Sequence, residues 1–438
     1  MSEQMVNHKC PACSGPLHFE GRTGKLECEY CGSNYEVSEI ETLYKEKENQ
    51  AVNAMNEQNN SSWDMSSVSG DWGNDATKMK AYSCPSCGAE LMCDENTAAS
   101  CCPYCGNQTV IPGMFTGGLK PDYVIPFKTD KNMAVNALKK HVQGKFLLPS
   151  SFASGNHIQE IQGVYVPFWL FDAQADGEMR FHATNSEKKR QGDEEITTTK
   201  HYDVFRKGKI SFEKVPVDAS SRMPDKHMDS IEPYDYRELK SFSTAYMPGY
   251  LADKYDVDVK ECGKRMEERC AKTFETEVVK SLNEYENKSV TESSVFVKKG
   301  TVHYAMLPVW LLATKWNGEN FLFAMNGQSG KMVGDLPLDK PKYWGMSLGL
   351  SALFIAVMLC LSNFVFAAPM TGAGFVVGCI LLPILLAFII SGIFKNQLKS
   401  VNGFAAGRYM DEKGLIITGK TDRFLRTTVE KRKISSGK

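Results

Sequence analysis

The chain has 438 residues, which leaves room for roughly two to four domains. Its 51 basic and 52 acidic residues give a net charge of −1, which argues against a protein whose whole surface is built to bind nucleic acid. Residues Met1 to Lys9 contain no apolar stretch, so we expect no secretory signal peptide.

Two cysteine-rich modules with the same spacing occupy the first 113 residues. Each has two Cys-x-x-Cys pairs separated by fourteen residues. In a cytosolic protein this pattern favours metal binding over disulfides. Four thiolates around one Zn²⁺ leave no position for water, so we predict two structural zinc sites rather than catalytic ones. The expected ligands are Cys10, Cys13, Cys28 and Cys31 in the first ribbon, residues 1–43, and Cys84, Cys87, Cys102 and Cys105 in the second, residues 80–113.

Two alternatives to these zinc ribbons are a redox dithiol and chance pairing. Both are disfavoured because four matched pairs must be explained at once. Cys101 sits beside Cys102 and could replace it as a ligand, but register with the first module favours Cys102.

The charge of the ribbons bears on their partners. Residues 1–43 carry three basic and seven acidic side chains, a net charge of −4, and residues 78–113 carry two and three, a net charge of −1. Phosphate binding needs clustered Lys or Arg, which neither ribbon has. We therefore predict protein partners and regard nucleic acid as the alternative.

The linker between the ribbons, residues 44–79, is polar, and from Asn59 onward it is rich in Asn, Ser, Gly and Asp. We expect it to be flexible. Trp63 and Trp72 stand out there. Packing against a neighbouring element is the favoured reading, and a short aromatic peptide for a partner is the other.

Residues 114–342 read as a strand-rich α+β domain. Apolar periodicity predicts helices over 130–143 and 258–282, and in part over 232–255. A buried strand is expected over 163–171, and alternating strands over 196–205 and 209–217 are separated by a hairpin signal at Arg206-Lys207-Gly208. A second turn is expected at 326–330.

This domain also contains a weak internal repeat. Tyr165-Val-Pro167-Phe-Trp169-Leu170 is echoed by Met306-Leu-Pro308-Val-Trp310-Leu311. Two copies of one β-hairpin unit packed around the Trp residues would explain the repeat, and coincidence of apolar strands is the alternative.

No catalytic motif is recognisable in the domain. A phosphate-binding Gly loop, His-Glu-x-x-His and Gly-x-Ser-x-Gly are all missing from the sequence, so we predict that the protein is not an enzyme. Five polar residues lie on or after predicted strands and are expected to be ordinary hydrogen-bonded residues: Asp172, His182, His201, Asp218 and His303.

The stretch from Tyr343 to Phe394 contains no Asp, Glu, Lys, Arg or His. A single helix of this length would span about 78 Å, against about 30 Å of bilayer hydrocarbon. Pro and Gly cluster at Ala367–Gly374, so we predict a hairpin of two transmembrane helices, residues 348–367 and 375–394. A hairpin buried in a soluble core is the alternative. Basic residues flank both ends, which predicts a plasma-membrane protein with both termini cytoplasmic.

Small-residue pairs lie at the start of both predicted helices, at Gly345-x-x-x-Gly349 and Gly374-x-x-x-Gly378. Such pairs permit close helix contact. Packing within one hairpin is favoured, and oligomerisation through the membrane helices is the alternative.

The tail, residues 395–438, carries eleven basic and four acidic residues, a net charge of +7. It follows the membrane directly, so we expect attraction to anionic lipid headgroups, of about 1 kcal/mol per basic residue. Apolar residues at 415–417 and 424–425 indicate that the tail is partly folded, against the main domain.

The whole pattern resembles a bacterial family, the transcription-factor-IIB-type zinc-ribbon membrane proteins. The resemblance is carried by the two ribbons, by Gly163-Val-Tyr-Val-Pro-Phe-Trp-Leu, by Met325-Asn-Gly-Gln-Ser-Gly-Lys and by the membrane hairpin. It implies a membrane anchor that recruits phage-shock-like or flotillin-like (SPFH) envelope-stress proteins. It names no catalytic residue.

We therefore predict a multidomain α+β protein with two four-cysteine zinc ribbons, a strand-rich cytosolic domain and a C-terminal transmembrane hairpin, residues 343–394. The expected function is a membrane-anchored adaptor for cytosolic proteins. The alternative is a membrane-tethered nucleic-acid-binding protein.

Overall fold

The computed structural model describes residues 17–20, 25–28, 31–36, 38–40, 62–68, 70–94, 97, 101–107, 110–113, 118–153, 161–365, 373–401 and 405–433. By its internal contacts the chain divides into two compact units, Met1–Ser62 and Trp63–Lys438. The predicted ligands Cys10 and Cys13, and the first part of the linker, lie outside the described residues.

The first unit contains a three-stranded antiparallel sheet of β1 (Leu17–Glu20), β2 (Lys25–Cys28) and β3 (Asn34–Tyr35). Its described core is four side chains, Leu17, Leu26, Cys28 and Ile40. A core of this size supplies little folding free energy, so a unit like this relies on another source of stability such as a metal.

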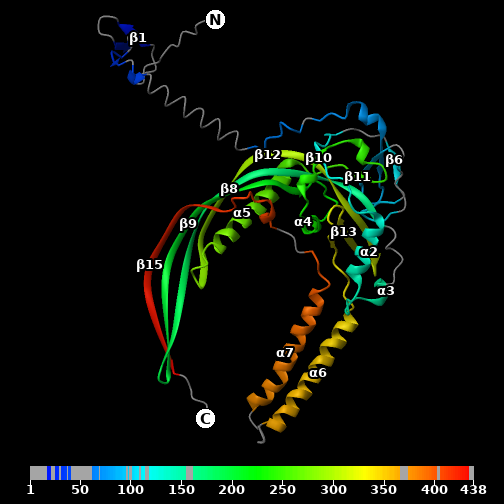
Figure 1. The fold of residues 1–438 in the computed structure, drawn as a ribbon, viewed down its shortest axis with the longest axis vertical. Coiled ribbons are helices and arrows are strands. Elements are labelled where there is room, and N and C mark those ends of the chain that lie inside the picture. The colour runs from blue at the N-terminus through cyan, green and yellow to red at the C-terminus, as the bar shows by residue number, and fades with distance from the viewer. Residues whose placement is uncertain are drawn as a thin grey trace. The chain divides into compact units, whose positions relative to one another are not determined.

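The second unit is built on a 12-stranded mixed sheet (Figure 1). Its centre is an antiparallel pair of 30-residue strands, β8 (Gln162–Gln191) and β12 (Asn287–Trp316). The sheet runs in the order β10-β7-β12-β8-β11-β5-β4-β6, with β9 and then β15 added beside β8, and β13 and then β14 beside β12. The other strands are β4 (Met79–Ser83), β5 (Glu90–Asp94), β6 (Ile111–Gly113), β7 (Tyr123–Val124), β9 (Glu194–Asp218), β10 (Lys240–Ser241), β11 (Leu251–Asp253), β13 (Glu319–Asn326), β14 (Met332–Val333) and β15 (Ile416–Lys433).

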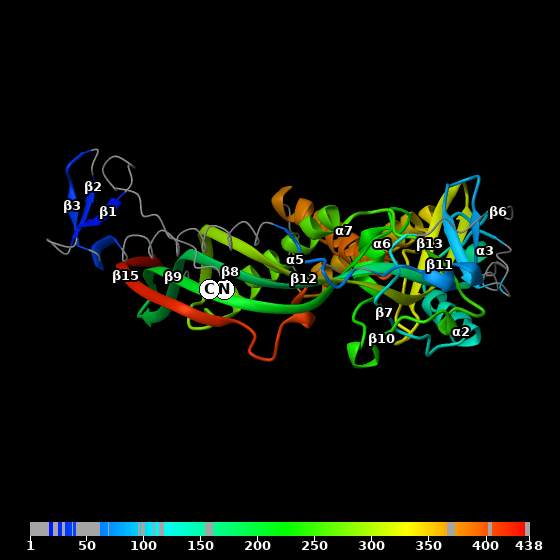
Figure 2. The ribbon, with the colours of Figure 1, turned by 90° about the horizontal axis from the view of Figure 1, so that it is seen from above.

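Strand β9 corrects one sequence prediction. The hairpin expected at Arg206-Lys207-Gly208 does not form, because β9 runs without a turn from Glu194 to Asp218. The chain reverses earlier, at Gly192, which has a φ of +62°. Gly208 instead permits close contact with β15, since a Cβ there would lie 2.9 Å from the Ile416 carbonyl oxygen. Figure 2 shows β15, β9 and β8 side by side.

The weak repeat coincides with the central strand pair. The matched positions of the repeat are 141 residues apart: 165 and 306, 167 and 308, and 169 and 310. Val166 lies opposite Leu307 in the sheet, and these two residues are also 141 apart. The two copies are therefore related by a local twofold axis through this pair. Each copy continues into a hairpin, β8 into β9 and β12 into β13.

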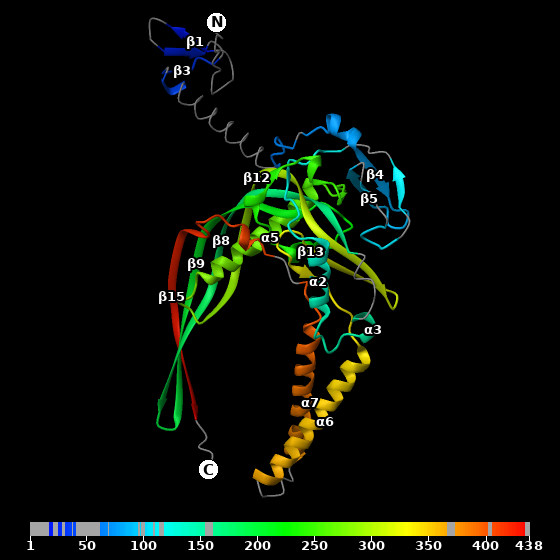
Figure 3. The same cartoon turned by 45° about the vertical axis from the view of Figure 1, so that its right-hand side comes forward.

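Both faces of the central sheet are buried. Even-numbered β8 residues from Val164 to Leu170 pack in one core, and odd-numbered residues such as Tyr165 and Trp169 pack in another. Helix α5 (Val259–Lys280) covers the second face and runs along the concave side of the long strands (Figures 1 and 3). Its contact is close, because a Cβ on Gly177 would lie 2.7 Å from the Phe274 ring.

Two predicted helices are confirmed, and each begins at an aspartate cap. Asp130 caps α2 (Lys131–Val142) by accepting from the Met133 N–H, and Asp258 caps α5 by accepting from the Glu261 N–H. Such a cap satisfies one of the N–H groups that a helix leaves unpaired. Before the apolar C-terminal stretch, the described residues also form the short helices α3 (Ser150–Ala153) and α4 (Asp225–Ile231).

The partial helix expected over 232–255 is wrong. This segment has two single 3₁₀ turns, Tyr236–Glu238 and Thr244–Tyr246, and two short strands. The turn expected at 326–330 is confirmed, since it joins β13 to β14 and the Gly330 N–H donates to the Asn326 carbonyl at 2.9 Å.

The two linker tryptophans are part of the core. Trp72 is 5% exposed, and Trp63 packs edge-on against Phe171 with ring centroids 4.8 Å apart. The packing interpretation is therefore confirmed, and the interpretation as an aromatic peptide for a partner is wrong.

The apolar C-terminal stretch forms two helices that pack together, α6 (Lys340–Val365) and α7 (Ala373–Asn396) (Figure 3). Both are long and apolar enough to cross a membrane. Only 11% and 22% of their most apolar windows are buried, so this chain does not enclose them in a soluble core. Gly345 and Gly349 do not mediate the packing, because a Cβ on either would meet nothing within 4 Å.

The tail is folded against the main domain, as predicted. Strand β15 pairs with β9 along its whole length, from Ile416 opposite Lys209 to Lys433 opposite Glu194. Arg206 of β9 is 2% exposed and forms an ion pair with Asp422 of β15, which fixes the register of the two strands.

Candidate metal centre

The four cysteines predicted for the second ribbon come together in one cluster. The sulfur atoms of Cys84, Cys87, Cys102 and Cys105 all lie within 4.8 Å of one another. Two cross-pairs, Cys84 with Cys105 and Cys87 with Cys102, have Sγ–Sγ distances of 3.6 Å. Tetrahedral Zn²⁺ with Zn–S bonds of about 2.3 Å requires S–S distances of about 3.8 Å. The cluster therefore has the size and the donor set to bind zinc.

Each half of the cluster is a tight knuckle closed by a glycine. The Gly88 N–H donates to the Cys84 carbonyl at 2.8 Å, and the Gly106 N–H donates to the Cys102 carbonyl at 2.9 Å. The φ values of the two glycines are +72° and +71°, a conformation that residues with a Cβ rarely adopt. The Cys-x-x-Cys-Gly sequence thus determines the local geometry that presents two thiols.

The cysteine pair Cys28 and Cys31 of the first unit is followed by a glycine that makes the same closing hydrogen bond. The Gly32 N–H donates to the Cys28 carbonyl at 2.8 Å, and the φ of Gly32 is +73°. Because the partner ligands Cys10 and Cys13 lie outside the described residues, the first zinc site stays a prediction.

Cys101, the alternative ligand, lies outside the cluster. Its sulfur accepts a hydrogen bond from the Gln162 side chain, whereas Cys102 is buried among the other three sulfurs. The two adjacent cysteines thus face different surroundings, and the structure places Cys102 at the ligand position.

The thiols differ in how readily they ionise. Burial raises the pKa of Cys102 and of Cys87 above the usual value. Burial also opposes ionisation of Cys84, but hydrogen bonds from the Cys87 and Ser86 backbone outweigh it and lower the pKa to about 7. Four thiolates this close repel one another unless a cation lies between them, which is the role that zinc would have here.

The second ribbon is built into the main sheet. Its strand β5 pairs with β11, Met92 opposite Ala252, and β11 in turn pairs with β8. The guanidinium of Arg222 donates to the knuckle carbonyl of Gly88 at 2.6 Å and to Asp256 at 2.6 Å. Tyr104, in the other knuckle, is half-buried, and its buried hydroxyl lies beside Asp253. The cluster is therefore held on both sides by residues of the main domain.

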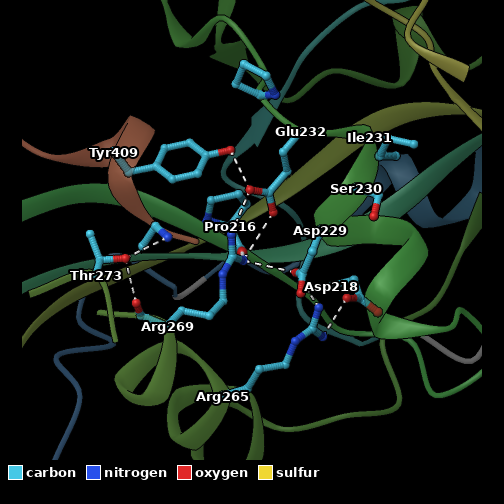
Figure 4. Close-up of polar contacts among 12 residues, drawn as sticks. Pro216, Asp218, Asp229, Ser230, Ile231, Glu232, Arg265, Arg269, Thr273 and Tyr409 are labelled. Carbon is cyan, nitrogen blue, oxygen red and sulfur yellow. Dashed lines mark hydrogen bonds and ion pairs between the residues drawn. The ribbon is translucent and has the colours of Figure 1, made fainter. Parts of the chain in front are cut away.

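A buried network of charged groups lies where α5 packs against β9 and α4 (Figure 4). Arg265 donates to Asp218 at 2.8 Å and to Asp229 at 2.5 Å. Arg269, which is 0% exposed, donates to Asp229 at 3.1 Å and to Glu232 at 2.7 Å. Three buried carboxyl groups thus share two guanidinium groups.

The network also holds the segment that follows α7. The Tyr409 hydroxyl donates to Glu232 at 2.9 Å, and the Ala406 N–H donates to the Thr273 hydroxyl at 3.0 Å (Figure 4). Sequence reasoning expected Asp218 to be an ordinary hydrogen-bonded residue and missed the other members. A usable signal was present, because Arg269 interrupts the apolar stripe of α5 between Met266 and Cys270.

Three of the other polar residues singled out from the sequence, Asp172, His182 and His201, have ordinary hydrogen bonds. Asp172 accepts from the Lys214 N–H at 2.8 Å and from the Thr301 hydroxyl at 2.5 Å. The Nδ1 atom of His201 lies 3.2 Å from the Nε2 atom of His182. These contacts fit the structural roles that were expected. His303 differs, because its ring packs against Tyr123 and its buried Nδ1 has no hydrogen-bond partner among the described residues.

The charge network makes stability depend on pH. Burial raises the pKa of Asp218 and of Glu232 to about 7, against the opposing effect of the nearby arginines. A raised pKa means that these carboxyl groups bind a proton more tightly in the folded state than in the unfolded state. The stabilisation of the folded state that results is complete below the unfolded pKa near 4 and is lost as the pH rises through 7. Between pH 6 and pH 8, we expect the free energy of unfolding to fall by an amount on the order of 1–3 kcal/mol. This pH range keeps the thiols bound to the metal.

Asp218→Asn tests this prediction, because the amide cannot titrate and can still accept from Arg265. Thermal unfolding of the purified protein should show a flatter pH dependence for this variant than for the wild type. Equal slopes for both proteins would mean that Asp218 does not carry the effect.

These features define a class of protein: a four-cysteine centre of zinc-ribbon type fused to a large mixed sheet, followed by two apolar helices long enough to cross a membrane. The chain is 32% identical over 372 residues to the uncharacterized protein YdjG of Bacillus subtilis (strain 168), a match that covers 85% of this chain and 100% of that protein. It therefore belongs to the same family as YdjG. No family profile matches the chain, and no solved structure matches it.

Proposed function

We propose that this protein is a membrane-anchored adaptor of the transcription-factor-IIB-type zinc-ribbon kind, which holds cytosolic proteins at the bacterial plasma membrane. The observation that carries the proposal is the combination of a closed four-thiol centre with an exposed apolar helical pair. A closed centre fixes the fold and leaves no coordination position for a substrate. An exposed apolar surface of this size needs a lipid environment. We assign no catalytic role.

The two ends of the helical pair support a hairpin topology. The Leu336 N–H, before α6, donates to the Leu398 carbonyl, after α7, at 2.9 Å. The Ser400 N–H donates to Asp335 at 2.9 Å. The segments before α6 and after α7 are hydrogen-bonded to each other, so both lie on the same side of any bilayer that the helices cross. Basic residues flank both helices, so the positive-inside rule favours the cytoplasm for that side and for both termini.

The first unit is the module that we assign to partner binding. It is compact by itself, whereas the second ribbon is part of the main sheet. Its net charge of −4 over residues 1–43 favours a partner with a basic surface. The resemblance noted above suggests phage-shock-like or SPFH envelope-stress proteins as that partner. The basic residues of the tail would add attraction to anionic lipids.

Crosslinking in native membranes tests this function. The full chain is crosslinked, extracted in detergent and purified, and bound proteins are identified by mass spectrometry. We expect a specific partner with the wild type and with Cys101→Ser, and its loss with Cys28→Ser combined with Cys31→Ser. Recovery of the same proteins with all three would contradict the assignment to the first unit.

The alternative, a membrane-tethered nucleic-acid-binding protein, makes a different prediction. The purified full chain would then retard DNA or RNA in a salt-dependent manner, because phosphate contacts release counterions. The adaptor function predicts no retardation at 150 mM salt, a concentration of about physiological strength.

A further inference from the structure

A cavity of about 600 Å³ lies at the start of α6. Its wall is formed by the first residues of this helix, by α3 and by the turn that joins β12 to β13. Trp344, in the first turns of α6, is 53% exposed, and exposed tryptophan is typical of the membrane–water interface. With α6 inserted as proposed above, the cavity lies at the level of the lipid headgroups.

Two charged side chains in the cavity wall have no ion pair or hydrogen bond among the described residues. They are Lys340, the first residue of α6, and Glu319, from the β12–β13 turn. The third charged side chain of the cavity wall, Asp339, forms an ion pair with Lys342 at 3.5 Å, and Lys342 also donates to the Leu148 carbonyl at 3.0 Å. Within the part of the chain that the structure describes, the cavity thus offers one free cation and one free anion.

We propose that this cavity binds the phosphoethanolamine headgroup of a membrane phospholipid. The phosphate would lie at the Lys340 ammonium, and the amine would lie at the Glu319 carboxylate. A zwitterionic headgroup satisfies both charges, whereas an anionic lipid would leave Glu319 unpaired and repelled by the phosphate. The Trp316 ring supplies an apolar wall for the glycerol region. The volume is within the range of about 300–1,000 Å³ that is usual for small-molecule sites.

Native mass spectrometry of the full chain in detergent tests the proposal. The protein is titrated with short-chain phosphatidylethanolamine, with short-chain phosphatidylglycerol and with soluble phosphoethanolamine. The variants are Lys340→Gln and Glu319→Gln. Lys399→Gln is the matched control, because it removes a basic residue just beyond the other helix and outside the cavity wall.

Phosphatidylethanolamine should bind the wild type and Lys399→Gln equally, and each cavity variant about tenfold more weakly, which corresponds to one lost charged contact of about 1.4 kcal/mol. Phosphatidylglycerol should bind the wild type more weakly, and Glu319→Gln should not reduce its binding. Equal binding of phosphatidylethanolamine to all four proteins would overturn the site. Equally tight binding of soluble phosphoethanolamine would overturn its assignment to a lipid.

The inference rests on the proposed membrane insertion, so insertion is measured separately. Alkaline carbonate extraction of the membranes should leave all four proteins in the pellet. Release of the wild type would remove the anchor function itself. Retention of the wild type, together with lipid binding that the variants do not change, would remove only the cavity as a lipid site.

Discussion

Replacing Cys102 with serine is expected to remove one zinc ion and to lower the thermal stability of the main domain. Cys102 is buried within the four-cysteine cluster, and a structural zinc site contributes roughly 10–16 kcal/mol of apparent binding free energy to folding. Strand β5 would lose its metal support, and it buries Leu91, Met92 and Cys93 in the main sheet. Exposure of Leu91 and Met92 costs about 1.5–3 kcal/mol each, which should lower Tm by about 10 °C.

The chain supplies two matched controls for this experiment. Cys101→Ser changes the adjacent cysteine, which lies outside the cluster, and should leave both zinc content and Tm unchanged. Cys28→Ser should also remove one zinc, but without lowering the Tm of the main domain, because the first unit is separate. Zinc is quantified by elemental analysis, and unfolding is followed by intrinsic fluorescence. A Tm unchanged in Cys102→Ser would show that the second ribbon does not support the sheet.

The four-cysteine cluster could be predicted from the sequence because its geometry is local. Each knuckle is a five-residue turn closed by a glycine, and two knuckles of the same spacing suffice to specify the donor set. The helices were predictable for the same reason, since α5 carries its own cap at Asp258 and its own apolar stripe. The merging of the second ribbon with the main sheet was not predictable, because β5 pairs with a strand at Leu251–Asp253.

The long strands show where local reasoning fails. A glycine between two alternating segments is typical of a turn, but Gly208 is required by the close contact of Ile416, far along the chain. Strands of 25 and 30 residues are also much longer than the usual five or six, which favours dividing them into shorter ones. The local twofold axis that relates β8 to β12 is easier to predict from the sequence. The internal repeat and the pairing of the two strands are both centred on the same pair of residues.

The buried charge network was the least predictable part. An arginine on an amphipathic helix is usually at the surface, and nothing near Arg269 in the sequence identifies Glu232 as its partner. The partner lies on an irregular segment that was expected to be partly helical. Tyr409, another member, follows the apolar helices and contacts Glu232 only because the tail folds back.

The substitution Arg269→Met is expected to lower the free energy of unfolding by about 3–5 kcal/mol. After the loss of zinc, this is the second large effect that we expect. The substitution fills a similar volume but leaves the carboxylates of Asp229 and Glu232 buried without their guanidinium partner. It also leaves the Pro216 carbonyl without the hydrogen bond that Arg269 donates at 2.7 Å. Chemical unfolding of the detergent-solubilised protein, followed by tryptophan fluorescence, measures the loss.

Three further variants separate a charge effect from a packing effect. Arg265→Met should cost less, because the Arg265 side chain is 17% exposed and water can partly replace it. Tyr409→Phe should cost about 1 kcal/mol, the usual contribution of one hydrogen bond, and should speed proteolysis of the tail. Adding Glu232→Gln to Arg269→Met should restore part of the stability, because it removes one of the uncompensated charges. If the double variant were instead less stable than Arg269→Met by the full cost of Glu232→Gln alone, the two residues would not be coupled, and the loss would have to come from packing.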